Sequence, residues 1–460
     1  MSNNSQDKIL TTFNELSNSF NRSDQYFDIL YESNSSLSIV KTSTAEDISG
    51  LVHKAGFVAR TFTNEWHEFA SPVLADFNHI ENRLPKVTQM GKNLREYEGW
   101  EIDAEIKPKI NAEDIPLEDK INKMREIFKY VTDSDKRIIT CRLTYTEQIN
   151  TKIFLNNEGS QLKQIIPRTK IIVIPIAKKG KSIDFDYLSV GAEIGFEIFD
   201  NSYYENLDHA IESSIDLLSA ENPPNGNYPI ILDPDMAGLI AHESFGHGLE
   251  ADQILRGRSY LTNKINSKVA SEICNIYDTP NLKGAWGYYF FDDEGIKAGN
   301  NLLVENGILK SLIHDRKTAS ILKAEPQGNG RREDFAHVIH PRMTNTYFGH
   351  GDHNIEEMIS EIKLGALLIH GYFGMEDPLG GNMVCTSKKG YLIKNGEKVK
   401  VLKMTALSGP VLDLLQNIDA VSKDKLELRP GTCGKGHADL VPVTSGGSYI
   451  KVEKALISPG

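Results

Sequence analysis

The chain has 460 residues, of which 40% are hydrophobic and 25% charged, a composition typical of a soluble globular protein with a large core. Its net charge of −12 is spread along the sequence without a basic cluster, so we expect no binding to nucleic acid. The sequence has no apolar run of about 18 residues, which excludes a membrane-spanning helix, and its four scattered cysteines indicate a cytoplasmic protein without a disulfide framework.

The first half of the chain predicts a mixture of helices and strands. A polar, amphipathic helix is expected at 6–20. Because this segment has no apolar run, we do not expect it to be a secretory signal. Strand-like runs follow at 26–32 and 36–43. Beyond a polar stretch, residues 116–132 are predicted to form a second helix.

Three further strand-like segments lie at 136–149, 169–180 and 182–199. Their apolar residues alternate with polar ones or form short runs, as they do in strands. Helices next to grouped strands indicate an α+β arrangement of layers rather than a parallel βαβ repeat.

The clearest break in the chain is "ENPPNGNYP" at 221–229, which is rich in proline, asparagine and glycine. We therefore predict an α/β N-terminal domain at 1–225 and a β-rich C-terminal domain at 226–460. In the second domain, Asn-Gly pairs between apolar runs at 304–315 and 391–403 indicate two hairpins. The strands are expected to close into a barrel or sandwich that carries a helix.

That helix contains the stretch "AGLIAHESFGHGLEAD", residues 237–252. Asp233 is predicted to cap it, with Pro234 in its first turn. His242 and His247 are five residues apart, against four in the common zinc peptidase motif. In a regular helix, two side chains five apart differ in direction by about 140°, whereas two side chains four apart differ by about 40°.

A single i→i+5 turn would correct this divergence, and Gly246 is the residue type that best tolerates a distorted turn. Two neutral imidazoles and a third protein ligand would then hold a zinc-like ion with one position left for water. Glu243 would take a proton from the water and deliver it to the leaving amine, while Glu250 or Asp252 could orient a histidine. The alternative is a buried helix whose histidines only satisfy hydrogen bonds.

The third ligand must come from far along the chain. Cys433, in "RPGTCGKGHADLVPV", has glycines on both sides and Lys435 nearby, whereas the other cysteines lie in strand-like or helical contexts. His437 in the same loop is a competing ligand. Cys433 and His437 could also be drawn as a nucleophilic pair, but their spacing is poor for one, and the histidine helix would then have no role.

Six stretches occur in the order typical of the TldD/PmbA family of metallopeptidases, and the sequence resembles the TldD-like catalytic branch of that family. They are "HESFGHGLEAD" (242–252), "FDDEG" (291–295), "NGILK" (306–310), "GNGRRE" (328–333), "PRMTNTY" (341–347) and "CGKG" (433–436). Together they span most of residues 230–460, while the N-terminal half contributes no sharp motif.

The resemblance implies a two-domain fold and a Zn2+ ion held by His242, His247 and Cys433. It also implies a dimer, either a homodimer or a heterodimer with a non-catalytic paralogue, that cleaves short or unfolded peptides bound as an added β-strand. Two positions depart from the family pattern. The family usually has glycine at Ala251 and glutamine at His437, and the second departure leaves the ligand assignment in that loop open.

Four more residues are candidates for substrate binding. Asp293, in an acidic run, could bind a substrate amine or hold a histidine, or the run could be a solvated turn. Arg331 and Arg332 could bind a peptide carboxylate or stabilise an oxyanion, or form structural salt bridges. Asn345 could hydrogen-bond a peptide backbone or order its loop.

The sequence therefore predicts a zinc-dependent peptidase in which Glu243 is the catalytic base. Its substrates are expected to be short or unfolded peptides, with the processing of one peptide precursor as a further option. The alternative from another class is a non-catalytic, metal-binding scaffold or regulatory subunit of a paralogous peptidase. The intact histidine helix argues against that alternative.

Overall fold

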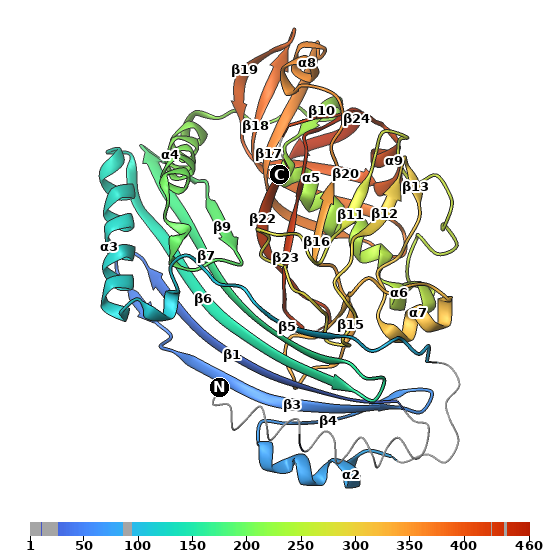
Figure 1. The fold of residues 1–460 in the computed structure, drawn as a ribbon. Helices are drawn as coiled ribbons and strands as arrows, with labels where there is room; N and C mark the ends of the chain where they lie inside the picture. Colours follow the sequence, from blue (N-terminus) through green and yellow to red (C-terminus); the bar gives the residue numbers. More distant parts are fainter. Residues whose placement is uncertain (1–10, 12–25, 86–93, 425, 437–438) are drawn as a thin grey trace.

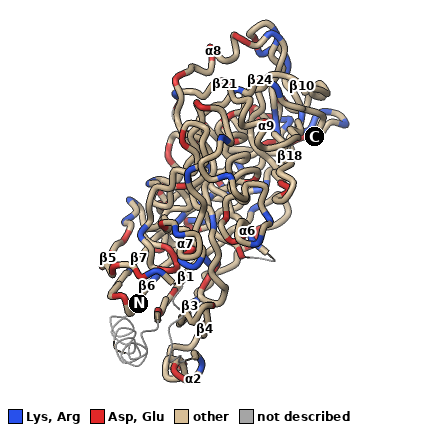
Figure 2. The backbone as a smooth tube through the Cα atoms, turned by 90° about the vertical axis from the view of Figure 1, so that its right-hand side faces the viewer, with Lys and Arg blue, Asp and Glu red and all other residues tan. Residues whose placement is uncertain are grey.

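The computed structural model describes residues 11, 26–85, 94–424, 426–436 and 439–460. A long curved sheet from the first half of the chain lies against a compact, β-rich second half (Figure 1). The helix predicted at 6–20 falls outside the described residues, apart from Thr11. Within the described ranges, no helix is both long and apolar enough to cross a membrane. Basic and acidic residues are interspersed along the chain (Figure 2).

The N-terminal sheet has nine strands, joined in the order β4-β3-β1-β6-β7-β5, with β2, β8 and β9 attached to this path. Its pairings are antiparallel except that of β5 with β7. The strands are β1 (Phe27–Lys41), β2 (Glu46–Ile48), β3 (Val52–Phe62), β4 (Trp66–Ser71), β5 (Glu101–Glu105), β6 (Ile138–Asn156), β7 (Gln161–Lys179), β8 (Ser182–Phe185) and β9 (Leu188–Ala192).

Several of these strands are longer than the sequence predicted. β1 is one strand, where two were expected, because Asn34 and Ser35 in its middle pair with β3 on one side and β6 on the other. The prediction of two strands was wrong because hydrogen bonds to two neighbours outweigh a local polar run. β6 and β7, each of 19 residues, likewise extend beyond the predicted runs at 136–149 and 169–180.

Two long helices cover one face of this sheet (Figure 1). α3 (Leu117–Ser134) confirms the helix predicted at 116–132. α4 (Asn201–Asp216) was not predicted, although Asp200 caps it by accepting a hydrogen bond from the Tyr203 backbone N–H. Shorter helical segments in this half are η1 (Leu74–His79), α2 (Ile80–Arg83), η2 (Ala112–Asp114), η3 (Phe196–Ile198) and η4 (Leu217–Ser219).

The two faces of the sheet have different environments, because successive strand residues point to opposite sides. Odd-numbered residues such as Leu143 and Ile171 pack in a core with α3 and α4. Even-numbered residues such as Lys152 and Arg168 face the C-terminal half and line a cavity there. This alternation places polar strand residues at the contact between the two halves.

The C-terminal half contains a closed barrel. The sequence predicted either a barrel or a sandwich here. Its strands are joined in the order β10-β17-β18-β20-β24, and β24 pairs back onto β10. β10 and β17 run parallel, and the other barrel pairings are antiparallel. The strands are β10 (Gly226–Leu232), β17 (Leu364–Glu376), β18 (Asn382–Lys394), β20 (Thr405–Pro410) and β24 (Ile450–Pro459), with β19 (Glu397–Leu402) and β21 (Ile418–Val421) at the side.

A six-stranded sheet packs with the barrel around a shared core. Its order is β13-β12-β11-β16-β23-β22. These strands are β11 (Ile276–Asp278), β12 (Asn301–Glu305), β13 (Ile308–Leu309), β16 (Asn345–Phe348), β22 (Glu427–Cys433) and β23 (Val441–Gly447), and β14 (Gly330–Arg331) pairs separately with β15 (His340–Pro341). Helix α7 (Arg316–Leu322) lies between β13 and β14, α8 (Ile355–Ser360) between β16 and β17, and α9 (Val411–Gln416) between β20 and β21.

Both predicted hairpins are confirmed. Asn306 and Gly307 join β12 to β13, and Asn395 and Gly396 join β18 to β19, all four with positive φ. Positive φ at both central residues is typical of a tight hairpin turn and explains the Asn-Gly pairs. With helices on the first sheet and a barrel in the second half, the fold is α+β, as predicted.

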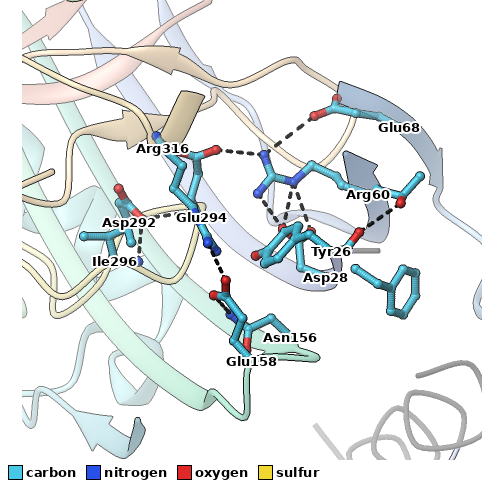
Figure 3. A network of polar contacts seen from close by, with 12 residues as sticks. Tyr26, Asp28, Arg60, Glu68, Asn156, Glu158, Asp292, Glu294, Ile296 and Arg316 are labelled. Carbon is cyan, nitrogen blue, oxygen red and sulfur yellow. Dashed lines mark hydrogen bonds and ion pairs between the residues drawn. The ribbon is translucent and has the colours of Figure 1, made fainter. Parts of the chain in front are cut away.

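A buried network of ion pairs joins the two halves (Figure 3). Arg60 of β3 contacts Asp28 of β1 at 2.6 Å and Glu294 of the C-terminal half at 3.1 Å. Arg316 of α7 contacts Glu158, in the turn after β6, at 2.7 Å. These pairs place the turn at 292–296 against the N-terminal sheet.

The run Asp292, Asp293 and Glu294 is therefore not a solvated turn, and that alternative was wrong. The three residues are only 3%, 3% and 1% exposed. Their carboxylates accept backbone hydrogen bonds or pair with basic residues of the N-terminal sheet. Buried acids of this kind are found where charge partners or hydrogen bonds compensate their desolvation.

Candidate metal centre

The histidine helix begins as the sequence predicted. The Asp233 side chain accepts a hydrogen bond from the Met236 backbone N–H, and Pro234 occupies the first turn of α5 (Pro234–Leu239). The helix then widens into a π-helical segment, η5 (Ile240–Gly246).

This π-helical segment confirms the predicted i→i+5 irregularity. His242 lies within it, and His247 begins the next short helix, η6 (His247–Leu249). The centroids of the two imidazole rings are 5.3 Å apart. The wider turn thus compensates for the extra residue between the histidines, and α6 (Ala251–Leu255) follows immediately.

Gly246 is needed for a different reason from the one predicted. Its φ of −62° and ψ of −43° are ordinary helical values, so it does not relieve backbone distortion. A Cβ atom at this position would instead lie 2.0 Å from Met343 Sδ. Gly246 therefore provides space for Met343, which packs against the π turn.

The third candidate ligand, Cys433, ends β22 and reaches the helix through the neighbouring strand β23. α5 lies directly against β23, since a Cβ atom at Gly238 would be 2.1 Å from the Gly446 nitrogen. Cys433 Sγ is 3.6 Å from His247 Nε2. One ligand atom from each of His242, His247 and Cys433 lies within 4.8 Å of the other two.

This donor set fits a divalent metal such as zinc, which binds imidazole nitrogen and thiolate sulfur. His242 Nδ1 is buried and has no hydrogen-bond partner in the described part of the chain. Burial raises the pKa of the Cys433 thiol, but the charges of His242 and His247 reverse this effect and hold the pKa well below its usual value. The thiolate form, which a metal requires, is therefore favoured.

The pKa values of the two histidines shift in the opposite direction. Burial lowers both, but Cys433 raises the pKa of His242 and Glu250 raises that of His247, so both end above their usual value. A metal therefore competes with protons for the ring nitrogens of both histidines.

Charged residues behind the histidines hold the centre in place. Glu250 Oε1 is 3.5 Å from His247 Nδ1, as the predicted orienting role requires. Lys435 Nζ lies 2.9 Å from Glu250 and 2.7 Å from Asp252. Burial raises the pKa of Glu250, but Lys435 and His247 lower it to about 2. Arg342 donates a 2.7 Å hydrogen bond to the Cys433 carbonyl and so fixes the cysteine backbone.

Glu243 is placed at the open side of the centre. Its Oε2 atom is 3.7 Å from His247 Nε2, and its side chain remains 35% exposed. It lines a cavity of about 180 Å³ together with Tyr187, Arg429 and Thr432. A carboxylate next to the candidate ligands and open to a cavity can exchange protons with a bound water or substrate.

No sequence pattern pointed to Glu376, at the end of β17. Both carboxylate oxygens are buried without a hydrogen-bond partner in the described ranges. Burial, together with Glu250 and Glu243, raises its pKa to about 8, against the effect of His247. Glu376 lies far from the motifs in the chain, and only the path of β17 past the π turn brings it near them.

The candidate substrate-binding residues do not lie at the three ligands. Asp293, Arg331 and Arg332 line a second, larger cavity. Asn345 is fully buried, and its amide donates a 2.7 Å hydrogen bond to the Thr279 carbonyl. His437, the competing ligand, lies outside the described residues.

Two parts of the chain match the domains of a known protein family. Residues 225–458 match the PmbA/TldA metallopeptidase C-terminal domain, and residues 110–218 match the PmbA/TldA metallopeptidase central domain. The chain belongs to the TldD/PmbA family. The first of these matches covers the histidine helix and Cys433, and the second covers α3, α4 and the two longest strands, β6 and β7.

Relatives in the TldD/PmbA family share most of the length of the chain. A metalloprotease of Methanocaldococcus jannaschii is 33% identical, covering 90% of this chain and 92% of its own. A zinc metalloprotease TldD homologue of Saccharolobus solfataricus is 30% identical over 73% of this chain and 75% of its own. Because these relatives are named metalloproteases, the chain is a member of a metallopeptidase family.

Two solved structures share the fold. TldE from Thermococcus kodakarensis has a TM-score of 0.74 at 19% identity, covering 97% of this chain and 100% of its own. A Thermotoga maritima protein, named as a proposed modulator of DNA gyrase, has a TM-score of 0.80 at 20% identity, covering 98% of this chain and 100% of its own. Both likenesses show that the fold is shared over nearly the whole chain.

Proposed function

We propose that this chain is a catalytic, TldD-like member of its family, a zinc-dependent peptidase that hydrolyses short or unfolded peptides. The observation that carries the proposal is the π turn of η5, which brings His242 and His247 to the Cys433 thiol while Glu243 stays open to a cavity. A helix whose histidines only satisfied hydrogen bonds would need neither the converging thiolate nor the open carboxylate.

In this proposal His242, His247 and Cys433 hold Zn2+. When bound, zinc supplies a Lewis acid that polarises the scissile carbonyl and makes a water more acidic. Glu243 accepts the proton of the attacking water and delivers it to the leaving amine. Glu250 holds the orientation of His247 through Nδ1, and Lys435 keeps Glu250 ionised.

The lining of the cavity supports an extended substrate. Residues Arg429 to Thr432 of β22 line it, and β22 is the terminal strand of the six-stranded sheet. A peptide added along such a strand is held mainly by backbone hydrogen bonds, which tolerate many side chains but require an unfolded chain. Both general peptide clearance and the processing of one precursor are compatible with this mode.

We also propose that the enzyme acts in the cytoplasm as a dimer. The likeness of its fold to Thermococcus TldE supports a partner of the same architecture, either a second copy or a non-catalytic paralogue. Light scattering of the purified chain, alone and mixed with such a paralogue, distinguishes the two assemblies.

The proposal is tested by Glu243→Gln. The variant should retain one zinc per chain by metal analysis yet lose about 100-fold to 10,000-fold of the wild-type rate on an unfolded peptide, since this is the usual contribution of a general base. Glu356→Gln, an exposed position in α8, is the matched control and should keep full activity. Hydrolysis retained by Glu243→Gln would refute the assignment. A wild-type chain that binds zinc but cleaves no peptide would instead indicate the scaffold alternative.

A further inference from the structure

A second cavity, the polar chamber, lies between the N-terminal sheet and the C-terminal half. Its volume is about 390 Å³, which is within the usual size of ligand sites. Even-numbered residues of β1, β6 and β7 line one side, and segments near Trp286, Arg331 and Pro442 line the other. The metal centre does not use this chamber.

One end of the polar chamber has its charges paired. Lys152 forms ion pairs with Asp293 and, at 3.6 Å, with Glu32 of the neighbouring strand. Lys54 pairs in the same way with Asp334. Burial lowers the pKa of Lys152, but Asp293 and Glu32 raise it above its usual value. Because acidic side chains already compensate the lysines at this end, a charged ligand would gain little there.

The other end, the cationic end, consists of Arg168, Lys170 and Arg331, none of which has a carboxylate within ion-pairing distance in the described part of the chain. Arg168 donates to the backbone carbonyls of Trp286 at 2.8 Å and of Tyr288 at 2.6 Å. Arg331 donates to two other backbone carbonyls. These carbonyls satisfy the hydrogen bonds but carry no net charge, so they do not neutralise the positive charges as a carboxylate at ion-pairing distance would.

Among the residues that the structure describes, the ammonium group of Lys170 contacts only an aromatic ring. Its Nζ atom lies 4.9 Å from the centre of the Trp286 ring. Trp286 Nε1, from the chamber lining, is a buried donor without an acceptor among the residues described. Unsatisfied buried donors of this kind are rare and often mark an absent ligand or water.

The electrostatics of the two ends differ accordingly. Burial and the like charge of Arg331 lower the pKa of Arg168 to about 10, although Glu193 acts against them from outside the chamber lining. Burial also lowers the pKa of Lys170. An anion at this end would relieve both effects, since it would compensate positive charges that are held away from water.

The cationic end is next to the cavity of the metal centre. Thr432, which precedes Cys433, lines both cavities. Arg331 also donates to the carbonyl of Pro442, the residue paired with Thr432 across the β22–β23 hairpin. A peptide extended along β22 past Cys433 would therefore reach the cationic end.

We propose that the cationic end of the polar chamber binds a carboxylate of the peptide substrate, either its C-terminus or the side chain of an aspartate or glutamate. The proposal rests on the peptidase function above and adds a preference among peptides to it. Lys170 and Trp286 contact the carboxylate, while Arg168 and Arg331 supply positive charge from fixed positions.

The test measures binding separately from cleavage. Three dye-labelled peptides of the same Gly/Ser/Ala sequence are titrated into the full-length Glu243→Gln chain and followed by fluorescence anisotropy. The first has one glutamate and an amidated C-terminus, the second has glutamine and a free C-terminus, and the third has glutamine and an amide. We expect at least one carboxylate peptide to bind about tenfold more tightly than the neutral third one, as a charged hydrogen bond can provide. The peptide that does so identifies the source of the carboxylate.

Variants of Lys170 connect this preference to the chamber. Lys170→Met should reduce the tenfold preference to less than about twofold, whereas Lys170→Arg should keep most of it. Lys178→Met, an exposed position near the end of the same strand, is the control and should bind like the parent chain. Equal binding of all three peptides, or a full preference in Lys170→Met, would overturn the proposal.

Failure of the peptidase proposal is seen in a different measurement. Zinc-loaded wild-type protein that cleaves none of the three peptides would count against peptidase activity, while a carboxylate preference in binding would still support the chamber. Cleavage of all three peptides with equal kcat/KM, combined with equal binding, would leave the peptidase intact and refute the chamber.

Discussion

Adding one methyl group at Gly246 should weaken both the fold and the metal centre. A Cβ atom there would lie 2.0 Å from Met343 Sδ, far inside contact distance, so Met343 or the π turn must move. Overpacking of this kind costs about 1–3 kcal/mol, and the better helix propensity of alanine returns at most about 1 kcal/mol. We therefore expect Gly246→Ala to reduce the free energy of unfolding by about 1–2 kcal/mol and, because His247 is the next residue, to weaken zinc binding severalfold.

The assay is a double-mutant cycle with Met343→Ala, followed by urea unfolding and zinc titration. Removing the Met343 side chain relieves the closest of these contacts, so Gly246→Ala should lose most of its cost in that background, where only the 3.0 Å approach to the Ala241 carbonyl oxygen remains. Gly238→Ala is the contrast, because its Cβ would meet the backbone of Gly446 and truncating Met343 cannot relieve it. Gly246→Ala with wild-type stability and zinc affinity, or an equal loss in both backgrounds, would refute this reasoning.

Four further predictions concern the metal centre and the ion pairs of Arg60. Cys433→Ser should lose most of its zinc in metal analysis, because a hydroxyl replaces a thiolate whose pKa the site already lowers; zinc bound as tightly as in wild type would contradict the ligand assignment. Glu250→Gln should weaken zinc binding about 10-fold to 100-fold in chelator competition, with the fold intact by circular dichroism, since it removes the charged orienting partner of His247 while Lys435 stays paired with Asp252. Zinc affinity should rise with pH through and above pH 6.5, because both histidine pKa values lie above that usual value and their protons must leave before metal binds; an affinity independent of pH between about 5 and 8 would count against this. Arg60→Met should lower the free energy of unfolding by about 3–5 kcal/mol in urea, since Asp28 and Glu294 would be left as buried unpaired acids.

Much of the candidate metal centre could be predicted from the sequence because its determinants are local. The Asp233 cap and the five-residue spacing of the histidines fix where the helix begins and that it must widen. Cys433 was found through its glycine-rich loop and through resemblance to a family. Glu376 was missed, since its burial and its raised pKa depend on how β17 passes the π turn.

The fold was harder to predict where tertiary contacts outweigh local pattern. The polar middle of β1 resembles a break in the sequence, but two neighbouring strands hydrogen-bond it into one continuous strand. The acidic run at 292–294 resembles an exposed turn, yet basic residues far away in the chain bury part of it. Neither outcome is visible without knowing which distant segments become neighbours.

The two faces of β6 and β7 meet different surroundings, and this limits which insertions and deletions the strands can accept. Odd positions supply the core beneath the two long helices, and even positions supply the chamber. A one-residue insertion inside either strand would turn every following side chain over, so that lysines and arginines would enter the apolar core and leucines the polar chamber. Insertions and deletions among relatives should therefore fall in the turns between these strands or occur in pairs.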